Sequence, residues 1–507
     1  MLARAHTFTI DGLSARHVAV ELDVRRGLPA FTIVGLADAA VREARERVRA
    51  AMLNCGYEFP AQRITANLAP GDLRKAGASF DLALAAALLA ASGQLPDERL
   101  ASHALFGELA LDGAVRGCQG ALAVAQATLR AGLTTLCVAR TRAHEAALVE
   151  ELDVAAVGDL RAAVRVLSGG RGDPLSRRRT CGRRSDTSRD SALDLADVRG
   201  QPRAVEALVI AAAGGHNLLL TGPPGTGKTM LAHRMASILP PLTRPEALDV
   251  TRIHSASGKP MCELAFERPF RAPHHSITAA GLIGGARRGF MGEAVLAHNG
   301  VLFLDELSEF ARPALQALRQ PLEEGHVALV RAGRCAVHPA RFMLLAATNP
   351  CPCGFAGEGE SCRCSDADRA RYARRLGGPL LDRIDLLVQM RRAGPDGRAE
   401  GMGSGAARER VAQARERQAA RLVGTGVTLN SQLDSRLLRR HARLESRAEE
   451  LVCRARERGM LSARGHDRAL RVARTIADLD ARERVSAGDV SAALADRPEA
   501  AIGGGDA

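Results

Sequence analysis

One stretch of the chain carries the residues of a phosphate-binding loop. Residues 222–229 match the pattern G-x-x-x-x-G-K-[ST] in full. An apolar run precedes the loop and a helical pattern follows it, which is the context in which backbone N–H groups cradle phosphates. Lys228 would reach the β- and γ-phosphates, and the Thr229 hydroxyl would ligate Mg²⁺. The sequence therefore predicts a site for ATP and Mg²⁺, lined by Gly222, Pro223, Pro224, Gly225, Thr226, Gly227, Lys228 and Thr229.

Two acidic residues follow a predicted buried strand further along the chain. Residues 301–304 are all apolar, and Asp305 and Glu306 come directly after them. Because the carboxyl ends of buried parallel strands face the ligand in such folds, we expect Asp305 in the Mg²⁺ shell and Glu306 beside the attacking water. A further apolar strand, 342–348, ends at Asn349, whose amide can hydrogen-bond the γ-phosphate or the water. The alternative for Asn349 is a residue that only terminates the strand.

Two arginines are candidates for contacts with the phosphates. Arg383 lies between Asp382 and Asp385 in an apolar stretch. An arginine flanked by acids is typical of a structural ion pair, unless the fold places it at the edge of a subunit. Arg464 lies near the start of a helical pattern in the C-terminal part, from which it could swing onto the phosphates.

Four cysteines form two C-x-C pairs that are separated by eight residues. They are Cys351, Cys353, Cys362 and Cys364. Two close thiol pairs across a short loop can surround a tetrahedral Zn²⁺, although C-x-C is tighter than the usual spacing of zinc ligands. Free thiols and a redox switch are the alternatives. Four thiolates leave no open position, so a zinc ion here would be structural and not catalytic.

The elements that must position these residues fall into three predicted domains. Residues 1–167 alternate strand and helix patterns, and residues 168–192 are basic and polar, as in a flexible linker. The nucleotide domain is predicted over 193–392, followed by a glycine-rich linker at 393–405. Residues 406–497 are almost wholly helical in pattern, with one break at 426–430.

Composition limits the class of protein and of partner. The chain has 507 residues and a formal net charge of +13, which favours a polyanionic partner such as nucleic acid. Lysine occurs only at 75, 228 and 259, so the charge comes from arginine and reflects coding bias in part. The longest apolar run, 82–91, is too short to span a membrane and predicts a buried helix. With no signal-peptide pattern at the N-terminus, we expect a cytoplasmic protein without a membrane partner.

These motifs together resemble the ComM/YifB family within the magnesium-chelatase-like AAA+ ATPases. Supporting stretches are 270–275, 297–300, 318–323 and 349–354. The resemblance covers nearly the whole chain outside the linkers. It implies an α/β multidomain protein with an N-terminal α+β domain, a central AAA+ domain with a parallel sheet, and a C-terminal helical lid.

The resemblance also implies roles for single residues and for the assembly. Asn349 would be sensor 1 and Arg464 sensor 2, both in the same subunit as Lys228. Arg383 would be an arginine finger that acts on the nucleotide of the neighbouring subunit, and Glu306 and Asp305 would complete the catalytic set. Members of the family are hexameric DNA helicases or branch-migration motors associated with natural transformation. We therefore expect ATP and Mg²⁺ as cofactors, and single-stranded or branched DNA and further copies of the chain as partners.

Two segments are candidates for contact with DNA by the same resemblance. One is a glycine-rich insert at 271–289, and the other is a predicted hairpin at 326–337. Arginines contact DNA phosphates without regard to base sequence, although each of them singly could equally be a solvated surface residue. The candidates are Arg271, Arg287, Arg288, Arg331 and Arg334.

Residues 73–92 and 105–132 resemble the proteolytic domain of Lon-type proteases. Ser79 occupies the position of the nucleophile, but the position of the catalytic lysine falls at Leu122. A serine nucleophile needs a neighbouring base, and His103 is the only nearby substitute, so we expect this domain not to be proteolytic. Two further functions remain open: an unfoldase or Lon-like protease that acts on polypeptides, and the ATPase subunit of a magnesium chelatase. The N-terminal domain speaks against the chelatase.

Overall fold

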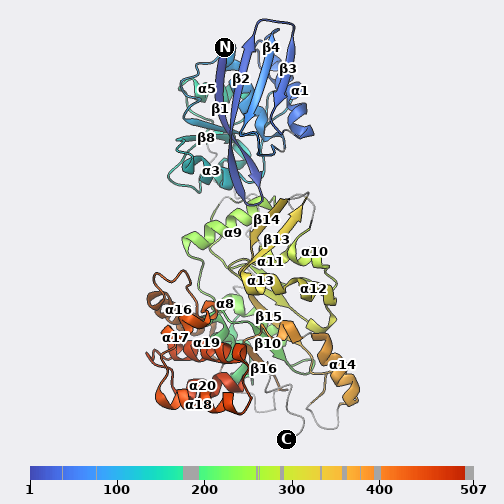
Figure 1. The fold of residues 1–507 in the computed structure, drawn as a ribbon, viewed down its shortest axis with the longest axis vertical. Helices are drawn as coiled ribbons and strands as arrows, with labels where there is room; N and C mark the ends of the chain where they lie inside the picture. The colour runs from blue at the N-terminus through green and yellow to red at the C-terminus, as the bar shows by residue number, and fades with distance from the viewer. Residues whose placement is uncertain are drawn as a thin grey trace. The chain divides into compact units, whose positions relative to one another are not determined.

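The computed structural model describes residues 1–36, 38–75, 77–174, 193–258, 261, 263–285, 291–331, 334–356, 362–376, 378–392 and 401–496. The chain divides into two compact units (Figure 1). The first contains residues up to 183 together with 244–265 and 330–338, and the second contains the rest.

The first unit is built on a mixed sheet of seven strands in the order β3-β4-β2-β1-β5-β8-β9. The strands β1, β2 and β4 pair antiparallel, whereas β1, β5, β8 and β9 are parallel neighbours. Their bounds are β1 (Leu2–Asp11), β2 (Ser14–Arg25), β3 (Ala30–Val34), β4 (Arg63–Ala69), β5 (His103–Phe106), β8 (Thr135–Ala139) and β9 (Asp153–Val157), with a small ribbon of β6 (Glu108–Leu109) and β7 (Val115–Arg116).

A helix that is apolar on every side forms the centre of this unit. All eleven residues of α2 (Asp81–Ala91) are buried, as expected for a helix without a polar face. The predicted buried helix at 82–91 is therefore confirmed. The other helical elements are α1 (Ala39–Asn54), η1 (Ala78–Phe80), α3 (Ala121–Arg130), α4 (Arg140–Ala146), α5 (Leu160–Leu167) and α9 (Arg244–Ala256).

Helix α9 belongs to this unit although it lies far along the chain. Arg244 pairs with Glu150 at 3.0 Å, and the Ser255 hydroxyl donates to the buried Glu145 carboxylate on α4. Glu145 also accepts the backbone N–H of Leu122 at 3.1 Å. These contacts attach a segment from the middle of the chain to residues of the N-terminal part.

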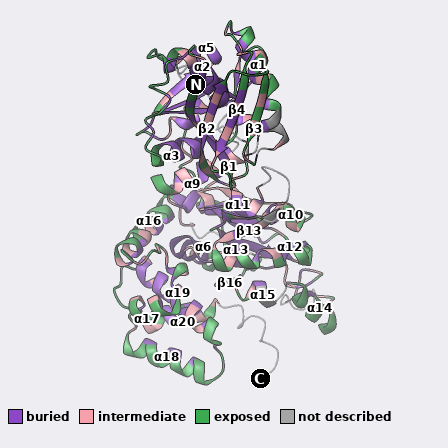
Figure 2. Cartoon of the chain, turned by 45° about the horizontal axis from the view of Figure 1, so that its top comes forward, coloured by how far each residue is buried: buried purple, intermediate pink, exposed green. Residues whose placement is uncertain are grey.

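The second unit is built on a parallel sheet of five strands in the order β11-β12-β15-β10-β16. The three middle strands are apolar and almost wholly buried, as expected when helices cover both faces of a parallel sheet. Figure 2 colours the buried residues of the chain purple. The bounds of the strands are β10 (Leu218–Thr221), β11 (Phe270–Arg271), β12 (Val301–Leu304), β15 (Met343–Thr348) and β16 (Leu386–Gln389). The predicted strands before Asp305 and Asn349 are thus confirmed.

Helical elements surround this sheet, and a bundle of helices follows it in the sequence. The former are η4 (Leu195–Asp197), α6 (Pro202–Gly214), α7 (Lys228–His233), α8 (Met235–Ile238), α10 (Ala279–Ile283), α11 (Glu293–Leu296), η5 (Leu307–Glu309), α12 (Arg312–Ala317), α13 (Arg319–Glu324), α14 (Asp366–Leu376) and α15 (Gly378–Leu381). The latter are α16 (Ser404–Arg421), η7 (Asn430–Gln432), α17 (Ser435–His441), α18 (Ser446–Glu457), α19 (Ala463–Leu479) and α20 (Ala487–Ala495). The helical character predicted for the C-terminal part is confirmed.

The C-terminal helices share one hydrophobic core with α6 and the strands. Inside this core Asp478 is buried, and its carboxylate accepts hydrogen bonds from Arg421 on α16 at 2.6 Å and from Arg474 at 2.9 Å. The pairing of the buried acid with two guanidinium groups fixes α16 against α19.

The predicted hairpin at 326–337 is also present. It consists of β13 (His326–Arg331) and β14 (Arg334–Pro339). Among the described helices, none combines the length and the apolar character that a membrane span requires.

Candidate nucleotide site

The phosphate loop connects β10 to α7 at the carboxyl edge of the parallel sheet. Gly227 adopts a left-handed backbone with a φ of 85°, which favours glycine. Gly222 lies so close to the end of β16 that an added Cβ would be 2.5 Å from the Met390 carbonyl oxygen. Glycine is therefore required at both positions by conformation and by space.

The Lys228 ammonium group is turned onto the loop itself. It donates to the carbonyl oxygens of Gly222 at 2.6 Å and Pro223 at 2.9 Å, and to the Asn349 side-chain oxygen at 3.2 Å. Burial lowers the pKa of Lys228, while the nearby Asp305 acts in the opposite direction. The ammonium group thus lies among oxygen acceptors at the place where phosphate oxygens would bind.

Thr229 and Asp305 come together as candidate magnesium ligands. The Thr229 hydroxyl donates to the Asp305 carboxylate at 2.7 Å. A hydroxyl and a carboxylate oxygen beside a phosphate loop are the ligands by which Mg²⁺ is held together with phosphate oxygens and waters. The donor set fits Mg²⁺, with Thr229 and Asp305 as the protein ligands.

Glu306 lies at a sharp change of chain direction. Its φ is 52°, in the left-handed region that a residue other than glycine rarely adopts. Its side chain is 62% exposed, so it is accessible to water and to a bound nucleotide. Backbone strain of this kind is concentrated at functional sites.

His275 is a site residue that sequence reasoning did not assign to the nucleotide. Its Nδ1 lies 3.5 Å from the Glu306 carboxylate, and its ring stacks on that of His274 with 4.0 Å between centroids. The contact arises because β11 pairs with β12, so the segment after β11 meets the residues after β12. The sequence placed His274 and His275 within the predicted insert 271–289 and within the family stretch 270–275, but gave neither a role at the nucleotide.

Arg383 lies at the opposite edge of the sheet from the phosphate loop. Its carbonyl oxygen accepts from the side chain of Asn217 at 2.8 Å, and Asn217 directly precedes β10. The length of β10 therefore separates it from the loop, about 13 Å at a rise of about 3.3 Å per residue. The guanidinium group pairs with Glu323 of α13. The structure does not bring Arg383 to the phosphate loop of its own chain.

Arg464 lies near the same edge as Arg383. One turn further along α19, Arg468 donates to the Ile384 carbonyl oxygen at 2.9 Å. Further along still, Thr475 hydrogen-bonds His216, the residue before Asn217, at 2.8 Å. These two contacts hold α19 at the amino edge of the sheet. Arg464 is exposed, and among the described contacts no hydrogen bond or ion pair joins it to Lys228, so its predicted role beside Lys228 in the same subunit stays a prediction.

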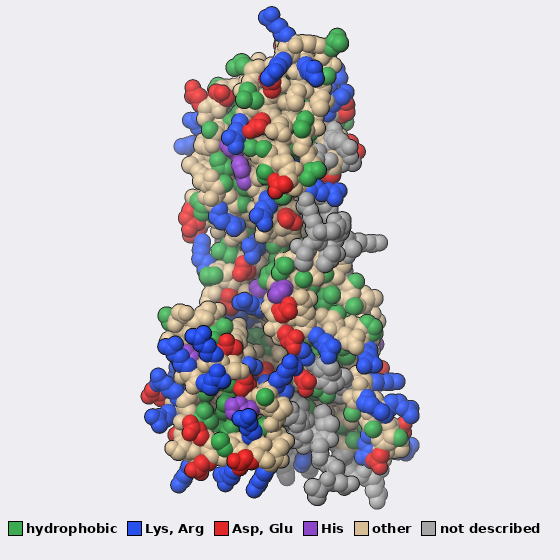
Figure 3. Space-filling model, viewed as in Figure 1, with side chains coloured by type: hydrophobic (Ala, Val, Ile, Leu, Met, Phe, Trp, Pro, Cys, Tyr) green, Lys and Arg blue, Asp and Glu red, His purple; other side chains and the backbone are tan. Residues whose placement is uncertain are grey.

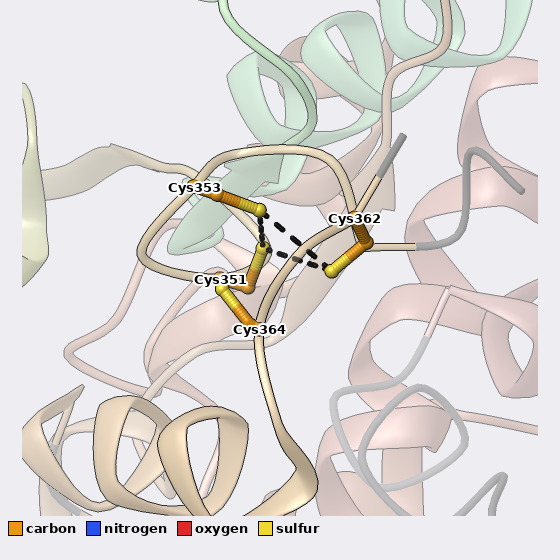
Figure 4. A group of neighbouring side chains, drawn as sticks. All are labelled: Cys351, Cys353, Cys362 and Cys364. Carbon is orange, nitrogen blue, oxygen red and sulfur yellow. Dashed lines mark hydrogen bonds between the residues drawn. The ribbon is translucent and has the colours of Figure 1, made fainter. Parts of the chain in front are cut away.

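The four cysteines of the two C-x-C pairs converge on one point directly after Asn349. Their Sγ atoms all lie within 4.8 Å of one another (Figure 4). The donor set fits a thiophilic metal such as zinc.

The DNA-contact candidates have different surroundings. The Arg271 guanidinium is bound by both Glu293 carboxylate oxygens at 2.6 and 2.8 Å and is 32% exposed. Arg287 and Arg288 lie outside the described residues. Arg331 and Arg334 lie at the facing ends of β13 and β14, and their side chains are outside those that the structure describes.

Ser79 lies in η1 and is 8% exposed. Within the described part of the chain, no hydrogen bond joins its hydroxyl to a base. His103 instead pairs with Ser102 at 3.0 Å, and Lys75 donates to the Pro70 carbonyl oxygen. The surroundings of Ser79 are those of a core residue.

Comparison with known proteins gives matches over almost the whole chain. Residues 194–396 match a family described as magnesium chelatase subunit ChlI, and residues 401–497 match its C-terminal part. Residues 20–142 match a family described as subunit ChlI of Mg-chelatase. The N-terminal domain therefore gives no argument against a chelatase.

Relatives of nearly full length are found in several bacteria. An uncharacterized protein of Mycobacterium tuberculosis is 46% identical over 98% of both chains. The uncharacterized protein YifB of Escherichia coli is 43% identical over 94% of both chains. Competence protein ComM of Haemophilus influenzae is 41% identical over 96% of this chain and 95% of its own.

Proposed function

Because the chain belongs to the ComM/YifB family of magnesium-chelatase-like AAA+ proteins, we propose that it is an ATP-driven DNA motor that works as a hexameric ring. The observation that carries the motor is the assembly of Lys228, Thr229, Asp305 and Asn349 around one point at the carboxyl edge of the sheet. Lys228 binds phosphate oxygens, Thr229 and Asp305 hold Mg²⁺, and Asn349 contacts the γ-phosphate. The magnesium ion supplies charge neutralisation for the transferred phosphoryl group.

Glu306 is proposed to orient the water that attacks the γ-phosphorus. Its carboxylate is accessible, and His275 lies within reach to hold it in place. The carboxylate accepts a hydrogen bond from the water and so directs the oxygen in line with the bond that breaks.

The separation of the site into two edges supports the proposed ring. The backbone of Arg383 and the helix α19 that carries Arg464 make their contacts at the edge opposite the phosphate loop, which supports a role for both arginines at a neighbour's site. In a ring, the amino edge of one subunit can meet the carboxyl edge of the next, and both arginines then contribute to the neighbour's site. Hydrolysis would depend on assembly, because an arginine finger accelerates the reaction by about 10³–10⁵-fold.

DNA as the substrate is supported by charge and by one relative. The net charge of +13 favours a polyanion, and the relative from Haemophilus influenzae is named for competence. On the face shown in Figure 3, arginines are intermingled with acids rather than gathered in one patch. Since the described residues of that face show no basic patch, we assign DNA contact to the two segments that the family resemblance indicates, 271–289 and 326–337. The resulting activity would be that of a helicase or a branch-migration motor.

The test is ATP turnover with and without forked and four-way-junction DNA, for the unmodified chain and for Glu306→Gln. We expect DNA to stimulate turnover, and the variant to lose about 10²–10⁴-fold in kcat while it still binds ATP. Glu309→Gln is the matched control, since Glu309 is an exposed acid three residues away. If DNA neither binds nor stimulates turnover, and junctions are not moved, the motor proposal is wrong.

For the N-terminal domain we propose a Lon-protease-like fold without proteolysis, which serves assembly or partner docking. The buried Ser79 without a bonded base supports this proposal. Casein degradation that is present and lost in Ser79→Ala would contradict it. The C-terminal helices are proposed to act as the lid of the motor.

A further inference from the structure

Four sulfur atoms lie within 4.8 Å of one another, and three of them have mutual distances close to those of a tetrahedral metal site. The Sγ of Cys351 lies 3.3 Å from that of Cys353 and 3.8 Å from that of Cys362, and the Cys353 and Cys362 sulfurs are 3.7 Å apart. Thiolates at about 2.3 Å from a central Zn²⁺ are about 3.8 Å apart when the geometry is tetrahedral. A disulfide would instead need about 2.05 Å between two sulfurs. The arrangement is that of ligands around one ion.

The sulfurs point toward one another from both sides of a loop, and Cys364 completes the group beside Cys351 (Figure 4). A turn brings the first pair into place, because the Gly354 N–H donates to the Cys351 carbonyl oxygen at 3.0 Å and Gly354 has a φ of 86°. The backbone N–H of Ala356 donates to the Cys351 sulfur at 3.3 Å. Such N–H donors orient thiolate ligands and balance their charge.

The first C-x-C pair connects the cysteine cluster to the nucleotide site. Cys351 follows Asn349 by two residues, and Asn349 accepts from Lys228. Gly354 packs on the phosphate loop so closely that an added Cβ would be 2.7 Å from Pro224 Cδ. The turn between Cys351 and Gly354 therefore contacts both the loop and its γ-phosphate sensor.

The second C-x-C pair leads through α14 to residues that follow β12 and end β15. Cys364 precedes α14 by two residues, and Tyr372 on α14 donates to the Ser308 hydroxyl at 2.9 Å. The Tyr372 hydroxyl also lies 3.2 Å from that of Thr348, the residue before Asn349. An ion that joins the two C-x-C pairs would hold together the ends of β12 and β15, where the catalytic residues lie.

The geometry points to a structural zinc centre of Cys351, Cys353, Cys362 and Cys364 that fixes Asn349 and the phosphate loop in position for ATP. The inference deepens the proposed ATP site but needs neither DNA nor hydrolysis. Four thiolates select a thiophilic ion, and they leave no position open for water, so the ion has no chemical step of its own.

The test is the metal content and the nucleotide affinity of the full chain, purified under reducing conditions without chelator. We expect about one zinc per chain, and tetrahedral thiolate bands in the visible spectrum after cobalt replacement. Cys362→Ser and Cys364→Ser should lose zinc and bind a fluorescent ATP analogue several-fold more weakly. Cys453→Ser, which changes an exposed cysteine on α18, should change neither quantity.

Three outcomes would overturn the inference. One is absence of zinc together with absence of the cobalt spectrum, and another is iron in place of zinc. The third is loss of zinc with unchanged ATP affinity, which would leave a metal without a role at the nucleotide site. If the serine variants do not fold, as judged by circular dichroism, chelator removal of zinc from the folded chain gives the same measurement. Because no arm uses DNA, failure here is distinct from failure of the DNA motor.

Discussion

At the scale of single residues, two histidine contacts show how tertiary position changes what a side chain does. His275 is brought to 3.5 Å from Glu306 by the pairing of two strands, and it can hold the carboxylate that directs water. His6 and His17 face each other across β1 and β2, with 2.9 Å between their ring nitrogens. Burial, together with the nearby His17 and Arg4, lowers the pKa of His6 to about 4. Only one of these rings can donate to the other while both are neutral.

The His6 contact predicts sensitivity of the first unit to acid. The pKa is about 6.5 in the unfolded chain and about 4 in the folded one, so the unfolded chain binds the proton more readily. The free energy of unfolding should therefore fall as the pH falls from about 6.5 to about 4. We expect His6→Gln to remove part of this loss, as measured by denaturant unfolding across that range.

Asp81 titrates in part of the same range with the opposite sign. Burial raises its pKa from 3.8 to about 6, so the stability that protonation of Asp81 contributes is lost as the pH rises from about 3.8 to about 6. The prediction for His6 therefore concerns the difference between variant and unmodified chain at each pH. Equal acid sensitivity of the two chains would show that His6 does not contribute.

At the scale of elements, one ion pair joins the two helices that pack beneath the N-terminal sheet. Arg47 on α1 donates to both oxygens of Asp81 in the first turn of α2, at 2.7 and 3.0 Å. The Asp81 carboxylate is fully buried, and it also accepts the Leu109 backbone N–H at 3.2 Å. The acid thus connects α1, α2 and β6. A buried carboxylate of this kind is stable only while its partners are in place.

Removal of this acid should destabilise the first unit. Asp81→Ala removes the carboxylate to which both Arg47 and the Leu109 N–H donate, and we expect a loss of about 3 kcal/mol in the free energy of unfolding. The matched control is Arg45→Ala on the same helix. This change breaks the ion pair between Arg45 and Glu46, whose side chains are 49% and 66% exposed, respectively. It should lower the free energy of unfolding by about 0.5 kcal/mol or less. Equal effects of the two changes in chemical denaturation would contradict the structural role of Asp81.

At the scale of the whole molecule, the candidate site is divided between opposite edges of one sheet. Lys228, Asp305, Glu306 and Asn349 gather at the carboxyl edge, whereas Arg383 is held at the amino edge. In the single chain the Arg383 guanidinium pairs with Glu323, which a neighbour's phosphates would have to replace. A single chain therefore holds the parts for binding ATP, and the proposed ring supplies the rest.

Mixed assemblies test this division. Lys228→Ala and Arg383→Ala should each lower ATP turnover, the second by about 10³-fold or more. If Arg383 acts on the neighbouring subunit, a mixture of the two inactive variants recovers part of the activity, because some interfaces then contain both intact residues. The same mixture with Arg464→Ala should also recover, since α19 lies at the same edge.

Two results would contradict this arrangement. Mixtures that remain inactive, although the variants assemble together, would show that the arginine acts on the nucleotide of its own subunit. Full activity of a monomeric preparation would remove the need for a ring. Assembly is measured by light scattering in the presence of ATP, and turnover by release of phosphate.

Local patterns in the sequence were enough to predict much of the nucleotide site. The glycine spacing of residues 222–229 and the apolar strands before Asp305 and Asn349 all act over a few residues, and the structure contains them. The C-x-C spacing likewise predicted the sulfur cluster, because the two cysteines of each pair are only two residues apart and must lie close together in space. The buried helix at 82–91 was readable because it is apolar on every side.

The tertiary structure decided which of these residues meet. The pairing of β11 with β12 placed His275 beside Glu306. The hydrophobic periodicity of the sequence reports local structure and could not predict a contact between segments about thirty residues apart. The packing of α19 against residues 381–384 holds this part of the helix at the amino edge of the sheet, which the motif around Arg464 alone does not predict. Motifs of this kind arise from chain geometry over a few residues, so the sequence alone determined them. The side of the sheet on which a distant residue lies depends on the packing of whole elements, which only the folded chain decides.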